Sequence, residues 1–145
     1  MFAVNSLCRL KKLQLTKCEL NTKIQLLISS DGKLPAEFIR YCRMATITKE
    51  ESLAFMKKKD PKAPVSDANE QKACALMVDL IIGVLGMYRT WNTAKTNAIA
   101  SGEDASASAN TRLVAQLIQT EKTLLGKLLI NVEKYASLMA KRTVN

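Results

Sequence analysis

The sequence predicts an all-α protein in which a basic, trihelical, helix-turn-helix-like N-terminal unit precedes a long antiparallel helical hairpin used for oligomerisation. Three observations predict this fold class. Helix-start signals recur along the chain, apolar residues repeat at helical spacing between them, and no useful run of alternating β-branched residues marks a strand. The 145 residues are 48% hydrophobic and 24% charged, which is close to the average of globular domains and sufficient to bury a core.

The N-terminus is basic and has no acidic residue before Glu19. It contains one arginine, few serines and no apolar run of signal-peptide length ahead of its basic residues. These features favour a basic amphipathic helix, with a short helix near residues 5–14, or a DNA-contacting arm over residues 1–15. A targeting segment is the alternative that stays open.

Short helices are expected next. Thr16–Glu19 and Thr48–Glu51 fit the capping-box pattern, in which a hydroxyl accepts the N–H of the third helical residue and a carboxylate reaches back. Pro35 stands where a first helical residue is favoured, after the turn-like Ser29–Gly32. Apolar residues share one face of each predicted helix. The N-terminal unit is therefore expected to contain helices over 17–29, 35–44 and 49–59.

Residues 57–64 contain four lysines and two prolines and predict a linker, because charge repulsion and proline disfavour a continuing helix. Charge is unevenly divided about this linker. Residues 1–62 hold 13 basic and 6 acidic residues, a net charge of +7, whereas residues 63–145 hold 9 and 7, a net charge of +2. We therefore expect a basic DNA-binding unit with its arm over 1–62 and an oligomerisation region over 63–145.

The second part is predicted to form two long helices, over residues 68–99 and 110–141, joined by the small-residue loop 100–109. The first helix is apolar nearly all round between Leu76 and Met87. The second carries two adjacent apolar stripes, which together are wider than one partner helix can cover. Self-association would bury this surplus.

Two glycines, Gly83 and Gly86, lie inside the first long helix, where each costs about 1 kcal/mol relative to alanine. They predict a close helix crossing, and a merely weakened helix is the alternative. Trp91 is the only tryptophan and is typical of an interface anchor, with packing inside the hairpin as an equal alternative. The predicted oligomer interface comprises Leu80, Gly83, Gly86, Trp91, Leu117, Leu124, Leu128 and Tyr135.

Basic side chains of the first part form the candidate DNA-binding surface. Arg40 and Arg43, with Tyr41, are expected on or beside the exposed side of the 35–44 helix. In a helix-turn-helix unit such side chains contact base edges, while flanking lysines hold phosphates. A plain solvated face is the alternative. The predicted DNA-binding residues are Lys33, Arg40, Tyr41, Arg43, Lys49, Lys57, Lys58, Lys59 and Lys62.

The sequence contains no histidine, which removes most general acid–base schemes and the common zinc sites. The cysteines at positions 8, 18, 42 and 74 have neither metal-ligand nor disulfide-framework spacing. They predict small buried side chains in a reducing compartment, with a reactive thiol as the alternative. Phosphate-loop, dinucleotide-binding, metal-binding and nucleophile-elbow motifs are absent from the sequence. We therefore expect no enzymatic activity, no catalytic residue, no cofactor and no metal site.

The order of the parts supports a family resemblance. A basic trihelical unit and a charged linker precede an apolar helix ending in Tyr-Arg-x-Trp at 88–91, and a loop then leads to Asn-Thr-Arg-Leu-Val-x-x-Leu-Ile-x-x-Glu-Lys-x-Leu-Leu at 110–125. This organisation, over residues 17–141, resembles a bacteriophage terminase small subunit. The resemblance implies N-terminal helices that bind the viral packaging site, a hairpin that builds a ring, and a tail that engages the large ATPase and nuclease subunit. The sequence departs from that pattern in having almost nothing after the hairpin.

We therefore expect a non-enzymatic, DNA-binding homo-oligomer that recognises a packaging site on double-stranded DNA and recruits a large terminase subunit. Weak phosphate contacts from each subunit would combine by avidity. The alternative is an all-helical scaffold or dimeric regulator whose apolar hairpin binds another protein, and a third is a small enzyme that uses cysteine or lysine. The most apolar stretch is shorter than a bilayer requires, so no membrane contact is expected and the expected location is the cytoplasm, that of the host for a viral protein.

Overall fold

The computed structural model describes residues 27–60, 62–89 and 93–142. Within these ranges the chain forms helices and turns, and no residue belongs to a strand. The prediction of an all-α fold is therefore confirmed. The helices are α2 (Ala36–Thr46), α3 (Lys49–Lys57), α4 (Asp67–Met87), α5 (Thr93–Ser101) and α6 (Ala109–Arg142).

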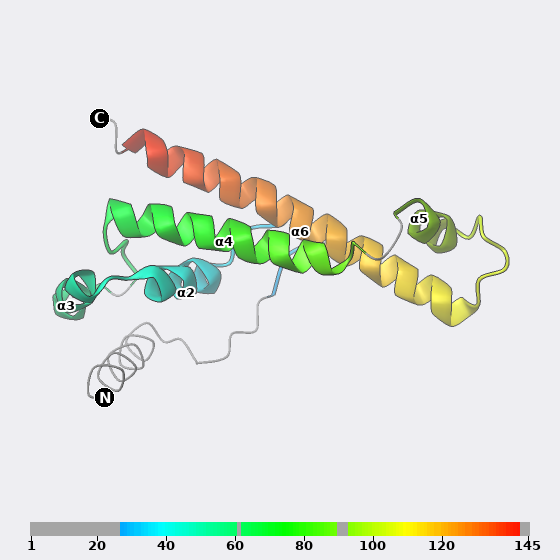
Figure 1. Cartoon of the computed structure of the whole chain (residues 1–145), viewed down its shortest axis with the longest axis horizontal. Coiled ribbons are helices and arrows are strands. Elements are labelled where there is room, and N and C mark those ends of the chain that lie inside the picture. The colour runs from blue at the N-terminus through cyan, green and yellow to red at the C-terminus, as the bar shows by residue number, and fades with distance from the viewer. Residues whose placement is uncertain (1–26, 61, 90–92, 143–145) are drawn as a thin grey trace.

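Helices α2, α4 and α6 pack side by side, and each extends past the end of the shorter one before it. Helix α4 lies between α2 and α6, and α2 packs against the N-terminal half of α4 (Figure 1). Helix α6 has 34 residues, which corresponds to a length of roughly 50 Å, and its N-terminal part extends past the end of α4. Helix α5 packs on that extension. Each helix in the series α2, α4, α6 is thus longer than the one before it and extends beyond it.

The main core is shared by α2, α4 and α6. Phe38 and Cys42 of α2 pack with Met77 of α4 and with Leu128 and Val132 of α6, and each of these side chains is almost fully buried. The expected boundary between residues 62 and 63 therefore does not coincide with a gap in packing. Helix α2 packs on α4, so the described part of the predicted trihelical unit is not separate from the predicted hairpin.

The helix-start signals act largely as predicted. Thr48 and Glu51 form the complete capping box of α3, with the Glu51 amide donating to Thr48 Oγ1 over 3.2 Å and the Thr48 amide donating to Glu51 Oε2 over 2.9 Å. The other Glu51 oxygen accepts a hydrogen bond from Ser66, whose own Oγ accepts the Asn69 amide at the start of α4. This relay joins the starts of α3 and α4, and it makes Ser66 the N-cap of α4.

The expected continuous helix over 68–99 is wrong. Helix α4 ends at Met87, and Tyr88 leaves the helical conformation with φ −89° and ψ 3°. A separate helix, α5, then packs Ile99 and Ala100 against Ala115 of α6. Because α4 ends at Met87, the separate helix α5 can cover a different face of α6 from the one that α4 covers. Gly102, with a φ of +85°, ends α5 in the left-handed conformation that glycine tolerates.

The first predicted helix, over 17–29, lies mostly outside the described residues, as do the helix or arm expected over residues 1–15 and the Thr16–Glu19 capping box. Its last residues, 27–29, are described and are not helical. They lead into a turn in which the Gly32 amide donates to the Ser29 carbonyl over 2.8 Å. Gly32 has a φ of +68° and sits directly against the backbone of α6. The turn is held there because Asn131 Nδ2 donates to the Gly32 carbonyl over 2.8 Å.

Candidate functional site

An apolar stripe on α4 changes from buried to exposed along its length. Ala73 and Met77 are fully buried, whereas Leu80, Val84 and Met87 are 41%, 41% and 75% exposed. These five residues follow the spacing i, i+4, i+7, i+11, i+14, which places them on one helical face. The exposure begins where α2 no longer covers α4, since α2 packs only on the N-terminal half.

Helix α6 also carries an apolar stripe that is buried in one part of the helix and exposed in another. Leu128 is buried at 1% exposure, whereas Leu113, Val114 and Leu117 are 64%, 45% and 58% exposed. Val114, Leu117 and Leu128 share one face of α6, and α4 covers that face only where the two helices lie side by side, not along the N-terminal part of α6. We call Leu80, Val84, Met87, Leu113, Val114 and Leu117 the apolar face.

The two halves of the apolar face meet at the end of α4. Tyr88, directly after Met87, donates a hydrogen bond to Glu121, which lies one turn after Leu117 on α6. A groove of about 240 Å³ opens beside the α4 half of the face. All of its lining side chains are apolar, namely Ile28, Phe38, Leu80, Ile81, Val84, Leu125 and Leu128. The face and the groove together offer apolar contact area that the described residues leave uncovered.

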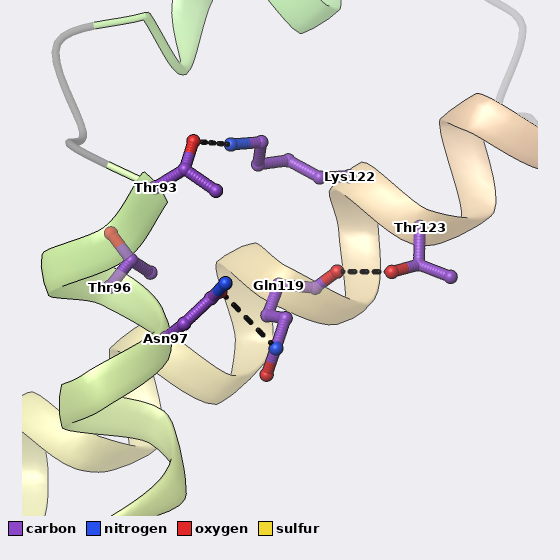
Figure 2. A pocket seen from close by; sticks show the side chains of 6 residues that line it. All are labelled: Thr93, Thr96, Asn97, Gln119, Lys122 and Thr123. Carbon is purple, nitrogen blue, oxygen red and sulfur yellow. Dashed lines mark hydrogen bonds between the residues drawn. The ribbon is translucent and has the colours of Figure 1, made fainter. Parts of the chain in front are cut away.

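A polar pocket of about 290 Å³ lies between α5 and α6 (Figure 2). Lys122 Nζ donates to Thr93 Oγ1 over 3.2 Å, and Gln119 Nε2 donates to Asn97 Oδ1 over 3.3 Å. Thr96 and Thr123 complete the lining. The polar groups of this pocket therefore link the two helices to each other, and the pocket contains one cation and no carboxylate.

Arg43 is not on the exposed side of α2, where the sequence analysis expected it. Its Nε and Nη2 atoms donate to the two oxygens of Glu70 over 2.6 and 2.7 Å, and its Nη1 donates to the Lys62 carbonyl over 3.0 Å. Tyr135 of α6 donates to the same carboxylate and accepts from Arg43 Nη2 over 3.2 Å. Burial would lower the pKa of Arg43, but the hydrogen bond and the charge of Glu70 outweigh it and raise that pKa. Arg43 thus holds α2, α4 and α6 together.

The other residues of the predicted DNA-binding helix are also partly enclosed. Arg40 Nη2 donates to Glu37 over 3.2 Å, and only 13% of the Arg40 side chain is exposed. Tyr41 is half-buried and packs against both neighbouring core clusters. Lys58 Nζ donates to the carbonyls of Pro64 and Val65 over 2.8 and 2.9 Å, which folds the loop back onto itself. These side chains serve local packing in this structure.

Five of the predicted DNA-binding residues are exposed, as expected. Lys49, Lys57, Lys59 and Lys62 lie on α3 and on the loop that follows it, at one end of the molecule (Figure 1). Lys33 is exposed as well, but it follows the turn at Gly32 rather than α3. The α3 group is therefore the basic surface that the structure brings together. Whether it binds DNA stays a prediction.

The predicted oligomer interface divides into buried and exposed members. Leu128 is fully buried in the chain's own core, and Tyr135 is tied to Glu70, so both expectations are wrong for an intermolecular contact. Gly83 is exposed, and a Cβ added there would meet no atom within 4 Å in the described part of the chain, so the expected close crossing is not seen. Leu80 and Leu117 are exposed members of the apolar face. Leu124 and Gly86 are partly buried, and Trp91 lies outside the described residues.

The described thiols offer no reactive centre. Cys42 and Cys74 are both buried, and burial raises the pKa of Cys42 to about 12, with a smaller contribution from Cys74. A thiol with so high a pKa stays protonated, and the thiolate is the nucleophile. Cys8 and Cys18 lie outside the described ranges. Among the residues that are described, no three histidine, cysteine or acidic side chains gather as metal ligands, and no helix has the length and apolar character needed to span a membrane.

Comparison with known families decides how this arrangement is classified. The family model described as Rubisco LSMT substrate-binding matches residues 5–125, which is most of the chain. The chain belongs to the Rubisco LSMT substrate-binding family. No curated protein matches the chain, and no solved structure matches it. None of these comparisons tests the resemblance to terminase small subunits, which stays a prediction.

The family match runs across residues 62 and 63 and includes α2 to α5 together with the N-terminal half of α6. Every residue of the apolar face therefore belongs to the part of the chain that the Rubisco LSMT substrate-binding family shares. The predicted interface did not include four residues of the apolar face, namely Val84, Met87, Leu113 and Val114. The signal that could have found them was the apolar stripe itself, which runs on past the point at which the short α2 can cover it.

Proposed function

We propose that the chain is a protein-binding module, and that its apolar face receives part of a protein substrate. The family is described by substrate binding, which supports a role in holding another molecule rather than in chemistry. The apolar face carries the proposal, because six large apolar side chains are exposed together on two neighbouring helices. Contiguous exposed apolar patches on single chains commonly mark interaction sites.

The shape of the site favours a macromolecule over a small ligand. The groove of about 240 Å³ is smaller than the pockets of about 300–1,000 Å³ that enclose small molecules. It suits one or two apolar anchor side chains of a partner, with the rest of the partner lying along the stripes of α4 and α6. A helix laid in an apolar groove makes contacts of this kind.

The proposal predicts that Val84→Asp weakens partner binding at least about tenfold, or about 1.4 kcal/mol, because a carboxylate must be desolvated in the contact. Peptides selected from a phage-displayed random library against the full chain serve as probes, and their affinities are measured by fluorescence anisotropy. Val84 is 41% exposed in the unbound chain, so the fold should tolerate the change.

Ile82→Asp is the matched control. Ile82 is 46% exposed on the same helix but points away from the stripe of Leu80, Val84 and Met87, so its replacement should leave the same affinities within about twofold. Selected peptides that ignore Val84→Asp, or that lose affinity equally with Ile82→Asp, would contradict the proposal.

Nucleic-acid binding is a second candidate function, favoured by the exposed lysines of α3 and the following loop. Lys49, Lys57, Lys59 and Lys62 offer four positive charges to phosphates without an accompanying base-reading arginine. This candidate predicts sequence-independent DNA binding that falls steeply with salt, and that drops several-fold when all four lysines become glutamine. Fluorescence anisotropy with a labelled duplex at two salt concentrations measures both effects. Affinity equal to that of the unsubstituted chain would remove the candidate.

Replacing Arg40 and Arg43 by alanine would not test DNA binding cleanly. Arg43 holds the core together, so its loss would lower stability as well as any affinity. Homo-oligomer formation and recruitment of a large terminase subunit remain predictions without a described contact to support them.

A further inference from the structure

The charge around the apolar face distinguishes between possible occupants. Arg89 is exposed and follows the α4 half of the face, and Lys33 and Lys127 are exposed beside the contact of Gly32 with Leu128, which lines the groove. Lys127 is positioned there because Gly32 packs on its Cβ and its Nζ donates to the Ser30 carbonyl over 2.8 Å. Basic side chains thus lie beside the α4 half of the apolar face and beside the groove.

Acidic groups near the face already have hydrogen-bond donors. Asp31 accepts the Ser29 hydroxyl and the Lys33 amide, and these bonds lower its pKa, while Glu121 accepts from Tyr88. The described basic side chains beside the face are not paired with carboxylates in this way. Over the described ranges no salt bridge joins Arg89, Lys33 or Lys127 to a carboxylate.

We propose that the occupant of the apolar face is an amphipathic helix of a partner protein, with apolar anchors at helical spacing and acidic residues on its flanks. This inference rests on the proposed protein-binding function and names the chemistry of the partner. Apolar anchors fit the stripe of Leu80, Val84 and Met87 and the groove beside it, and carboxylates complement the basic side chains beside them. A second copy of this chain fits less well, because each copy carries a net charge of +9 and the two would repel.

Two model peptides test the inference with the full chain. Both have about 18 residues, or five helical turns, and share one leucine stripe, but the polar face carries glutamate in one and lysine in the other. We expect the acidic peptide to bind at least about tenfold more tightly than the basic one at low salt, and the difference to shrink at high salt. We also expect Val84→Asp to weaken the acidic peptide.

Charge-reversal variants locate the effect. Arg89→Glu combined with Lys33→Glu should remove most of the preference for the acidic peptide, since both side chains are exposed beside the face. The matched control, Lys49→Glu with Lys59→Glu, carries the same charge change at the α3 end and should leave the preference largely intact.

The outcomes separate the inference from the function on which it rests. Equal binding of the two peptides, with sensitivity to Val84→Asp, overturns the acidic-helix inference and leaves the protein-binding proposal standing. Insensitivity of both peptides to Val84→Asp overturns both. If light scattering shows a dimer that dissociates with Val84→Asp, the occupant of the apolar face is a second copy of this chain. If duplex DNA displaces the acidic peptide from the face, the occupant is a nucleic acid. Either result overturns the inference.

Discussion

Replacing Glu70 by alanine should lower the free energy of unfolding by about 3–5 kcal/mol, because it leaves the guanidinium of Arg43 buried without its counter-charge. Glu70 is 2% exposed and receives hydrogen bonds from both Arg43 and Tyr135. The loss therefore acts on α2, α4 and α6 together. Urea denaturation followed by circular dichroism measures it.

Two controls identify the cause. Arg43→Met combined with Glu70→Leu removes both charges and should recover much of the loss, since apolar replacement of a buried ion pair is often close to neutral. Glu37→Ala breaks the partly exposed pair with Arg40 and should cost less than about 1 kcal/mol. A Glu70→Ala protein as stable as the unsubstituted chain would show that Arg43 is not held as the structure describes.

Gly32→Ala should destabilise the protein by about 2–4 kcal/mol, through backbone strain and a steric clash. Its φ of +68° is unfavourable for a residue with a Cβ. The added Cβ would lie 2.5 Å from Lys127 Cβ, 2.8 Å from the Lys127 carbonyl carbon and 2.9 Å from the Leu128 nitrogen. Thermal unfolding of the two proteins compares them directly.

Gly83→Ala serves as the control, for which we expect the opposite effect on stability. The new Cβ meets nothing within 4 Å in the described part of the chain, and Gly83 lies inside a helix, so the change should stabilise by about 0.5–1 kcal/mol. Similar effects of the two substitutions would argue against the close approach of the turn at Gly32 to α6.

Local signals predicted most of the helices. The capping box at Thr48, the loop after α5 and the long apolar periodicity of α6 appear in the structure near the expected positions. The break after Met87 was missed, because Tyr88 to Asn92 contain neither proline nor glycine and the apolar pattern resumes beyond them. In the structure α5 is a separate helix that packs on α6.

The candidate site was predictable only in part. The surplus apolar width of the predicted hairpin correctly indicated exposed side chains such as Leu80 and Leu117. Sequence alone could not show which residues of a stripe are covered, since this depends on where a neighbouring helix stops. It also assigned Arg43 to the surface, because a charged side chain is seldom buried unless a partner such as Glu70, 27 residues away, neutralises it.

The most direct test of the protein-binding proposal is an NMR titration of the ¹⁵N-labelled full chain with the tightest-binding selected peptide. The account predicts that amide shifts change most at Leu80, Val84 and Met87 of α4 and at Leu113, Val114 and Leu117 of α6, with little change over α3. Shifts confined to α3 and its lysines, or largest at Ile82 on the opposite side of α4, would contradict the assignment of the apolar face as the binding surface.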